Sequence, residues 1–193
     1  MPPQTPSQST ETLEKQVTGA TVWLTGLPSA GKTTIANELA GRLRAEGRKV
    51  EVLDGDEIRE FLSAGLGFSR EDRDTNVQRI GFLAELLARN GVLALVPVIA
   101  PFADSREAVR KRHQAGGTGY LEVHVATPVE VCSVRDVKGL YAKQAAGELK
   151  GLTGVDDPYE APEAPDLRIE SHTQTVQESA AALHALLTER GLS

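Results

Sequence analysis

Residues 26–33 read Gly26-Leu27-Pro28-Ser29-Ala30-Gly31-Lys32-Thr33. A glycine, four further residues and then Gly-Lys-Thr form the pattern of a phosphate-binding loop. Glycine lets the backbone turn so that successive N–H groups point at phosphate oxygens, and the N-terminus of a following helix adds partial positive charge. The loop therefore predicts binding of a nucleoside triphosphate.

The residues on either side of the loop fit a strand before it and a helix after it. Residues 20–26 are mostly apolar, as expected of a buried strand, and Ile35, Leu39 and Leu43 share one face of a helix over about 31–46. In this setting Lys32 reaches the β- and γ-phosphates, and the Thr33 hydroxyl ligates a phosphate-bound Mg²⁺. The alternative, a chance glycine turn, is disfavoured because both flanking elements are in register with the loop.

Composition limits the classes of partner and location. The chain has 193 residues, of which 40% are apolar and 25% charged, and its net charge of −6 argues against nucleic acid as the main partner. No apolar run approaches the roughly 20 residues that span a bilayer, so no membrane association is expected. The single Cys132 cannot form an internal disulfide and the N-terminus lacks a signal-peptide pattern, which favours a cytoplasmic location.

Strand and helix patterns alternate along the chain. After the first strand we expect strands at 49–54, 92–100, 120–125 and 167–169, separated by helices. The helices are expected from about 57, from Ser69 or Arg70 to about 89, from a cap at Asp104 or Ser105 to about 114, from Pro128, and over 175–187. The pattern predicts an α/β fold of the P-loop NTPase type: a parallel five-stranded sheet with helices on both faces.

The same pattern predicts how the chain is divided. Residues 1–18 are rich in Pro, Gln, Ser and Thr and are interpreted as a disordered tail. Residues 19–193 are expected to form one domain, with no boundary inside it. Residues 136–165 have few large apolar side chains and many Gly, Lys, Asp and Pro, so we expect a mobile lid with at most short helices.

Two carboxylates follow the second expected strand. Asp54 and Asp56 are therefore placed at the carboxyl end of the sheet, where ligands of open α/β sheets bind. A kinase that acts on a hydroxyl needs a carboxylate to orient it and accept its proton, and Asp56 is the candidate. Asp54 is expected to support the turn or a metal-bound water. The alternative is that Asp54-Gly55 is only a turn and Asp56 only a helix cap.

Further candidates lie between residues 59 and 79. Arg73 and Asn76 are three residues apart on one helix face and would form a fork for phosphate or sulfate oxygens if that face points at the cleft. Phe68 has few apolar neighbours in the sequence and could stack on a planar base. The alternatives are a solvated arginine face and ordinary burial of the phenylalanine.

The third expected strand ends Val96-Pro97-Val98-Ile99-Ala100-Pro101, without an acidic residue. Motor ATPases and GTPases hold Mg²⁺ with an aspartate at this position. Its absence favours a small-molecule kinase.

Several motifs follow the loop in a fixed order: Asp54-Gly55-Asp56-Glu57-Ile58-Arg59, Gly67-Phe68-Ser69, Arg73 with Asn76, Arg135-Asp136-Val137-Lys138-Gly139-Leu140-Tyr141 and Pro158-Tyr159-Glu160-Ala161-Pro162. Each alone is weak, but the ordered set resembles adenylylsulfate (APS) kinase from about residue 19 to the end. The resemblance implies phosphorylation of the 3′-hydroxyl of adenosine 5′-phosphosulfate by MgATP, giving PAPS and ADP in sulfate activation. It also implies a homodimer.

The resemblance assigns roles by matching position. Asp56 and Lys32 are implied to be catalytic. ATP is implied to bind the loop residues 26–33 and Thr34, with Arg135 and Gln174 near its base. The implied APS contacts are Asp56, Arg59, Phe68, Arg73, Asn76, Ile99, Lys138 and Leu152.

Three positions depart from the family pattern. Ala100 stands where many members have a serine that is phosphorylated in bacterial relatives, so direct in-line transfer is expected here. Leu152 replaces an aromatic residue, which removes one side of an expected stack on the APS adenine. Pro28-Ser29 replaces Ser-Gly in the loop, where both residues contribute mainly backbone. The alternatives are a related kinase for another small acceptor, such as a nucleoside or sugar acid, and a non-catalytic nucleotide switch.

Overall fold

A computed structural model describes residues 19–193; the predicted disordered tail, 1–18, lies outside the described residues. The sequence predicted a parallel five-stranded sheet, and the structure has one, with its strands in the order β2-β3-β1-β4-β5. The strands are β1 Ala20–Thr25, β2 Val50–Val52, β3 Leu93–Pro97, β4 Gly119–Val125 and β5 Leu167–Ile169. The helices are α1 Lys32–Ala45, α2 Gly55–Phe61, α3 Arg70–Ala88, α4 Ala103–Ala115, α5 Val129–Arg135, α6 Leu140–Ala145 and α7 Val176–Glu189.

β1 occupies the centre of the sheet and is buried along its whole length. It pairs with β3 on one side and β4 on the other, with Val22 opposite Leu95 and Leu121. A strand covered on both faces and both edges meets no water, which explains the nearly continuous apolar run before the phosphate-binding loop.

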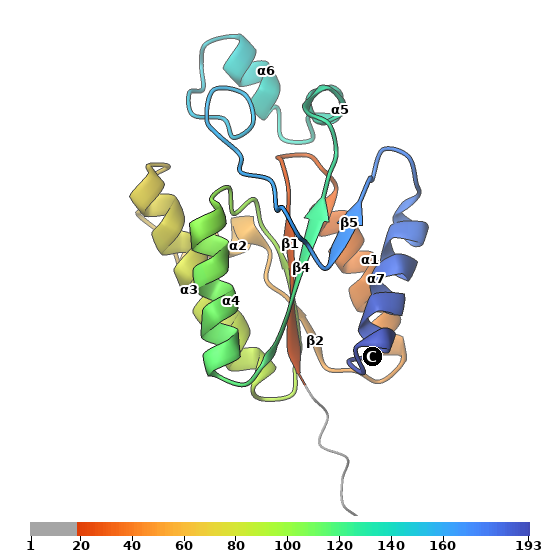
Figure 1. The fold of residues 1–193 in the computed structure, drawn as a ribbon. Coiled ribbons are helices and arrows are strands. Elements are labelled where there is room, and N and C mark those ends of the chain that lie inside the picture. Colours follow the sequence, from red (N-terminus) through yellow and green to blue (C-terminus); the bar gives the residue numbers. More distant parts are fainter. Residues whose placement is uncertain (1–18) are drawn as a thin grey trace, which may run out of the picture.

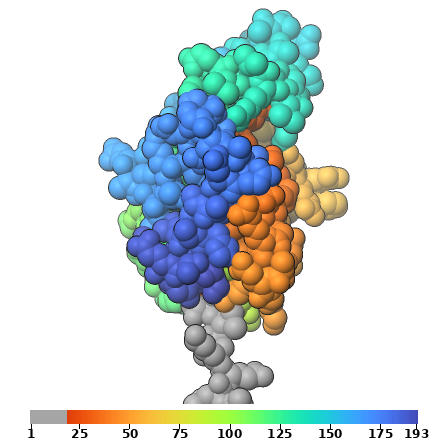
Figure 2. Space-filling model, turned by 90° about the vertical axis from the view of Figure 1, so that its right-hand side faces the viewer, coloured from red at the N-terminus to blue at the C-terminus, as the bar shows by residue number. Residues whose placement is uncertain are grey.

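The helices form two layers that cover the two faces of the sheet (Figure 1). α1 and α7 pack side by side on one face, where Leu39, Leu43 and Leu183 belong to the larger core cluster. α3 and α4 cover the other face around Trp23 and Ile80. Figure 2 views the molecule from the side of α1 and α7, which lie in contact there as orange and blue surfaces.

Short capping signals explain where two of the helices begin. The Ser69 side chain accepts a hydrogen bond from the backbone N–H of Asp72 and starts α3, as predicted. Thr175 and Glu178 form a capping box at the start of α7. These ends depend only on neighbours in sequence.

The structure corrects the predicted bounds of four elements. The prediction that Asp104 or Ser105 caps α4 was wrong: α4 begins at Ala103, after Phe102, and the Glu160 carboxylate accepts from the Ala103 N–H at 2.7 Å. α2 begins at Gly55, two residues earlier than expected. β2 and β3 are shorter than the predicted ranges 49–54 and 92–100, and each makes one further backbone hydrogen bond beyond its end, from Leu53 N to Leu95 O and from Val98 N to Leu24 O.

The predicted lid, residues 136–165, lies beyond the carboxyl ends of the strands (Figure 1) and rises above the body in Figure 2 as a cyan region. Its only helix in the described chain is α6, which agrees with the expectation of short helices. Tyr141, Leu152 and Thr153 are buried, so this segment packs on the domain in the structure. No helix within residues 19–193 is long and apolar enough to cross a membrane.

Leu183→Ala is expected to destabilise the fold by about 2–5 kcal/mol, because Leu183 is fully buried between α7 and α1 and the cavity cannot fill. Urea denaturation measures the loss. Leu62→Ala is the matched control, since Leu62 is 43% exposed and should lose less than about 1 kcal/mol. Equal losses in the two variants would contradict this packing.

Candidate active site

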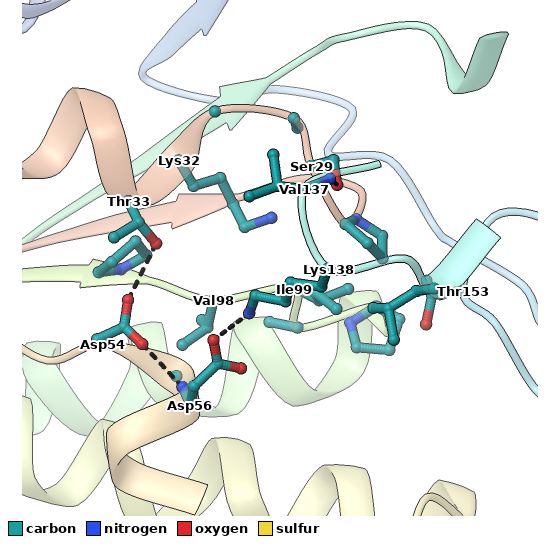
Figure 3. A pocket seen from close by; sticks show the side chains of 18 of the residues that line it. Ser29, Lys32, Thr33, Asp54, Asp56, Val98, Ile99, Val137, Lys138 and Thr153 are labelled. Atoms are coloured by element: carbon teal, nitrogen blue, oxygen red, sulfur yellow. Dashed lines mark hydrogen bonds and ion pairs between the residues drawn. The ribbon is translucent and has the colours of Figure 1, made fainter. Parts of the chain in front are cut away.

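A cavity of about 640 Å³ opens at the carboxyl ends of β1 and β3. It is lined by the phosphate-binding loop, the start of α2, residues 97–101 and the lid (Figure 3). Every predicted site residue lines it except Gly26 and Leu27, which form the first turn of the loop. The structure therefore brings together side chains that are up to about 150 residues apart in the sequence.

The loop backbone has the turn that its glycines predicted. Gly31 has a φ of 102° and precedes α1 directly, so the helix N-terminus faces the cavity. At Gly26 a Cβ atom would lie 2.5 Å from the Val125 carbonyl oxygen, so no larger residue fits. Ser29 also has a positive φ, 61°, at a position where the family commonly has glycine.

Lys32 folds back onto the loop. Its ammonium donates to the carbonyl oxygens of Gly26 at 2.9 Å and Leu27 at 2.7 Å. Burial disfavours the charged form and lowers the pKa of Lys32 to about 8, with Lys138 as a further lowering charge. An anion beside this ammonium would raise the pKa of Lys32 again.

Thr33, Asp54 and Asp56 lie in a row beside Lys32 (Figure 3). The Thr33 hydroxyl donates to Asp54 Oδ2 at 3.0 Å, and Asp54 Oδ1 accepts from the Asp56 N–H at 2.9 Å. Asp54 is thus the cap of α2, which confirms the prediction that it supports the turn. Asp56 is not a cap; its exposed carboxylate contacts the Lys138 ammonium from the lid.

Phe68 and Arg59 form the outer wall of the cavity. The Arg59 guanidinium lies 4.5 Å from the centroid of the Phe68 ring, and Phe68 is 65% exposed. The alternative of ordinary burial for Phe68 is therefore excluded, and much of the ring is available to a planar ligand.

Arg73 and Asn76 both face the cavity, but the Arg73 guanidinium already has partners. It donates to Phe68 O, Thr153 Oγ1 and Gly151 O at 2.6–2.8 Å and pairs with Asp157 at 2.9 Å. Three of its five N–H groups are thereby used in hydrogen bonds, and the ion pair engages the same Nη2 that bonds Gly151. The buried Asn76 Oδ1 has no hydrogen-bond partner among residues 19–193, so it is the freer polar group of the pair.

Residues 99–101 close the inner side of the cavity. Ala100 is buried and has a φ of 43°, a strained conformation for a residue with a Cβ. Its carbonyl accepts from Arg106 Nη1 at 2.7 Å, and Arg106 pairs with Glu122 at 2.8 Å in the interior. Sequence reasoning missed Arg106, since nothing separates it from the other charged residues of α4.

Arg135 and Gln174 lie at the end of the cavity nearest α7. Arg135 donates to the Ser171 carbonyl at 2.9 Å and to the Ala30 carbonyl at 3.3 Å. Gln174 donates to Ser179 at 2.8 Å. Ser171 also lines this end and was not singled out from the sequence. These residues surround the space beyond the loop, at the end of the cavity nearest α7.

Comparison with known proteins identifies the family. Residues 18–170 match the family model described as adenylylsulphate kinase. The chain belongs to the adenylylsulphate kinase family. It is 51% identical over 173 residues to the adenylyl-sulfate kinase of Picosynechococcus sp., covering 90% of this chain and 96% of that protein. A probable adenylyl-sulfate kinase of Synechocystis sp. is 54% identical over 164 residues, covering 85% of this chain and 90% of that protein.

A solved structure agrees in fold. The Mycobacterium tuberculosis APS kinase CysC in complex with AMPPNP and APS superposes with a TM-score of 0.86 at 44% identity, covering 89% of this chain and 98% of that chain. The predicted family resemblance, enzyme class and fold are thereby confirmed. For this adenylylsulphate kinase family member, the roles of individual residues stay predictions that rest on the geometry above.

Binding of ATP is expected to take up part of a proton at alkaline pH. The pKa of Lys32 is about 8 because of burial, and a triphosphate next to the ammonium raises it. Free Lys32 is therefore mostly protonated at about pH 7.5 and mostly neutral at about pH 9, while bound Lys32 is protonated at both. Calorimetry in buffers of different ionisation enthalpy measures the uptake, which should rise from about pH 7.5 to about pH 9.

Lys32→Arg is the control for this measurement, because arginine stays protonated at both pH values. Its proton uptake should not rise over the interval. Equal uptake by the original protein at both pH values would contradict the assignment of the low pKa to the lysine that meets the phosphates.

Proposed function

We propose that this protein transfers the γ-phosphoryl group of ATP to the 3′-hydroxyl of adenosine 5′-phosphosulfate, giving PAPS and ADP. One observation carries the proposal: a single cavity has a phosphate-binding loop at one end and the Phe68–Arg59–Asn76 wall at the other, with Asp56 between them. A base-stacking ring beside cationic and amide groups suits an adenine nucleotide with an anionic tail. Membership of the family supports the same reaction.

The phosphoryl donor binds at the loop in this proposal. Loop N–H groups and Lys32 hold the β- and γ-phosphates, while Arg135 and Gln174 flank the base. The hard oxygens of Thr33 and Asp54 suit Mg²⁺, directly or through water. No group of three or more His, Cys, Asp or Glu side chains in residues 19–193 could hold a metal alone, so phosphate oxygens and water would supply the other ligands. Bound Mg²⁺ would neutralise charge on the transferred group.

Asp56 is proposed to orient the acceptor. Its carboxylate accepts the 3′-hydroxyl proton as the oxygen attacks the γ-phosphorus, and the bond from that phosphorus to the β–γ bridging oxygen breaks to release ADP. Lys138 contacts Asp56 from the lid and adds positive charge beside the reacting groups. Ala100 has no hydroxyl, so we propose direct transfer without a phosphoenzyme at this position.

The acceptor is proposed to bind between Phe68 and the lid. Phe68 stacks on the adenine, Leu152 covers part of the space opposite, and Ile99 lies on the inner wall. Arg59, whose Nη1 donates to the Gly67 carbonyl at 2.8 Å, offers its remaining N–H groups, and Asn76 offers its side-chain amide. Arg73 is engaged mainly by the protein and holds residues 151–157 in place.

We further propose a homodimer in the cytoplasm, on the family resemblance and on the single cysteine. Sedimentation equilibrium of the purified protein tests the dimer, and a monomer at micromolar concentration would contradict it.

The reaction is tested by Mg²⁺-dependent ADP release with a panel of acceptors: APS, adenosine 5′-monophosphate, a nucleoside and a sugar acid. We expect release with APS and little with the others. Faster release with another acceptor would favour the related small-molecule kinase. ATP binding without release for any acceptor would favour a nucleotide switch.

Asp56→Asn is expected to lower kcat by about 10²-fold or more, because the amide cannot accept the proton. ATP affinity should change less than about twofold, since Asp56 does not touch the loop. Glu57→Gln is the matched control: its exposed carboxylate lies next in sequence but outside the cavity, and kcat should be unchanged. Near-normal turnover of Asp56→Asn would remove Asp56 from the mechanism.

Phe68→Ala is expected to raise the KM for APS by about tenfold, the effect of losing roughly 1.4 kcal/mol of stacking. The KM for ATP should stay within about twofold. Phe61→Ala is the control, because Phe61 is 75% exposed but does not line the cavity. Equal changes in both KM values, or equal effects of the two variants, would contradict the stacking role.

A further inference from the structure

The first part of the lid is hydrogen-bonded to the apex of the phosphate-binding loop. We call residues 135–141 the strap. Three donors of the strap reach three consecutive loop residues, 28–30. The pairs are Arg135 Nη1 to Ala30 O at 3.3 Å, Val137 N to Ser29 Oγ at 3.3 Å, and Tyr141 Oη to Pro28 O at 3.0 Å.

The strap is a tightly turned segment. Asp136 and Gly139 have positive φ values of 26° and 67°, so the backbone reverses twice within a few residues. The Asp136 carboxylate accepts from the N–H groups of Tyr141 at 3.0 Å and Ala142 at 2.9 Å, which closes the turn onto the start of α6. A segment held by its own carboxylate moves as a unit, so contacts at its ends determine the position of its middle.

Lys138 lies in the middle of the strap. Its side chain is 54% exposed, and its ammonium reaches the Asp56 carboxylate across the cavity (Figure 3). The strap contacts with the loop lie on either side of Lys138. The position of this ammonium therefore depends on where the strap meets the loop.

The contacts differ in strength because they differ in burial. Tyr141 is only 7% exposed, and its hydroxyl bonds the Pro28 carbonyl in the interior. A buried carbonyl that loses its donor stays without water, which costs more than losing an exposed bond. Ser29 accepts at the surface, and its hydroxyl exists only because serine replaces the common glycine at this loop position.

We propose that Tyr141 and Ser29 are positioning residues. They fix the position of the strap on the phosphate-binding loop and thereby hold the Lys138 ammonium beside Asp56 and the transferred phosphate. Neither residue needs to touch the acceptor. The inference rests on the proposed function, because Lys138 is read as a group that acts during phosphoryl transfer. It predicts that losing either contact lowers turnover more than it weakens binding.

Tyr141→Phe is the first test. We expect kcat to fall about five- to tenfold, the effect of one lost buried hydrogen bond of roughly 1–1.4 kcal/mol, with both KM values within about twofold. Tyr120→Phe is the matched control. The Tyr120 hydroxyl is buried without a hydrogen-bond partner among residues 19–193, and it lies on β4, outside the cavity. Its removal should leave kcat unchanged.

A double-mutant cycle with Lys138→Ala separates positioning from general loosening. If Tyr141 acts through Lys138, Tyr141→Phe changes kcat less than about twofold once Lys138 is alanine. Full additivity of the two losses would overturn the proposal. Ser29→Ala, at a partly exposed position that does not threaten folding, should show a smaller loss of kcat with the same non-additivity.

The outcomes distinguish this proposal from the function on which it rests. No APS-dependent ADP release by the original protein overturns the proposed function. Normal release by the original protein together with Tyr141→Phe and Ser29→Ala variants that match Tyr120→Phe overturns only the positioning role.

Discussion

The structure depends on how the backbone polar groups of the phosphate-binding loop are satisfied. A fully buried strand must turn into a helix within residues 26–31 and still present N–H groups to an anion. The carbonyl oxygens would repel that anion, and those of residues 26–28 and 30 each accept a hydrogen bond from a side chain. Lys32 bonds the first two, Tyr141 bonds that of Pro28, and Thr127 and Ser171 bond that of Ala30 at 2.9 and 2.7 Å. With these acceptors engaged, the loop and the N-terminus of α1 are suited to bind an anion.

The acceptor half of the site is built by long-range ion pairs. Arg73 of α3 holds residues 151–157 of the lid, and Arg106 of α4 bonds both Ala100 O and Glu160 O at 2.7 Å. Arg106 is buried and paired with Glu122, so removing Glu122 would leave the Arg106 guanidinium without a carboxylate partner in the interior. The same two helices that cover one sheet face thus carry the lid and the inner wall of the cavity.

Much of this architecture follows from local patterns. The five strands, the start of α3 near Ser69, the helix from about 175 and the short helical content of the lid were predicted because each depends on residues within a few positions. The start of α4 was predicted wrongly because its N-terminal N–H is satisfied by Glu160, 57 residues away. Arg106 and Tyr141 were not singled out as site residues, since a buried arginine on a polar helix and a tyrosine in a lid have no signal in spacing alone.

The sequence by itself determined the phosphate-binding loop, the parallel sheet and a set of candidate side chains. The hydrophobic periodicity and the motif spacing that indicate them are local properties of the chain, and glycine, proline and cap residues affect the backbone at their own positions. Only the tertiary structure decided which candidates meet. Lys138 reaches Asp56 across 82 residues of chain, and Tyr141 reaches Pro28 across 113. Such contacts form because packing of the two helical layers on the sheet offsets the entropy of closing these long loops. The direction in which each loop leaves the sheet then determines which other loop its side chains contact.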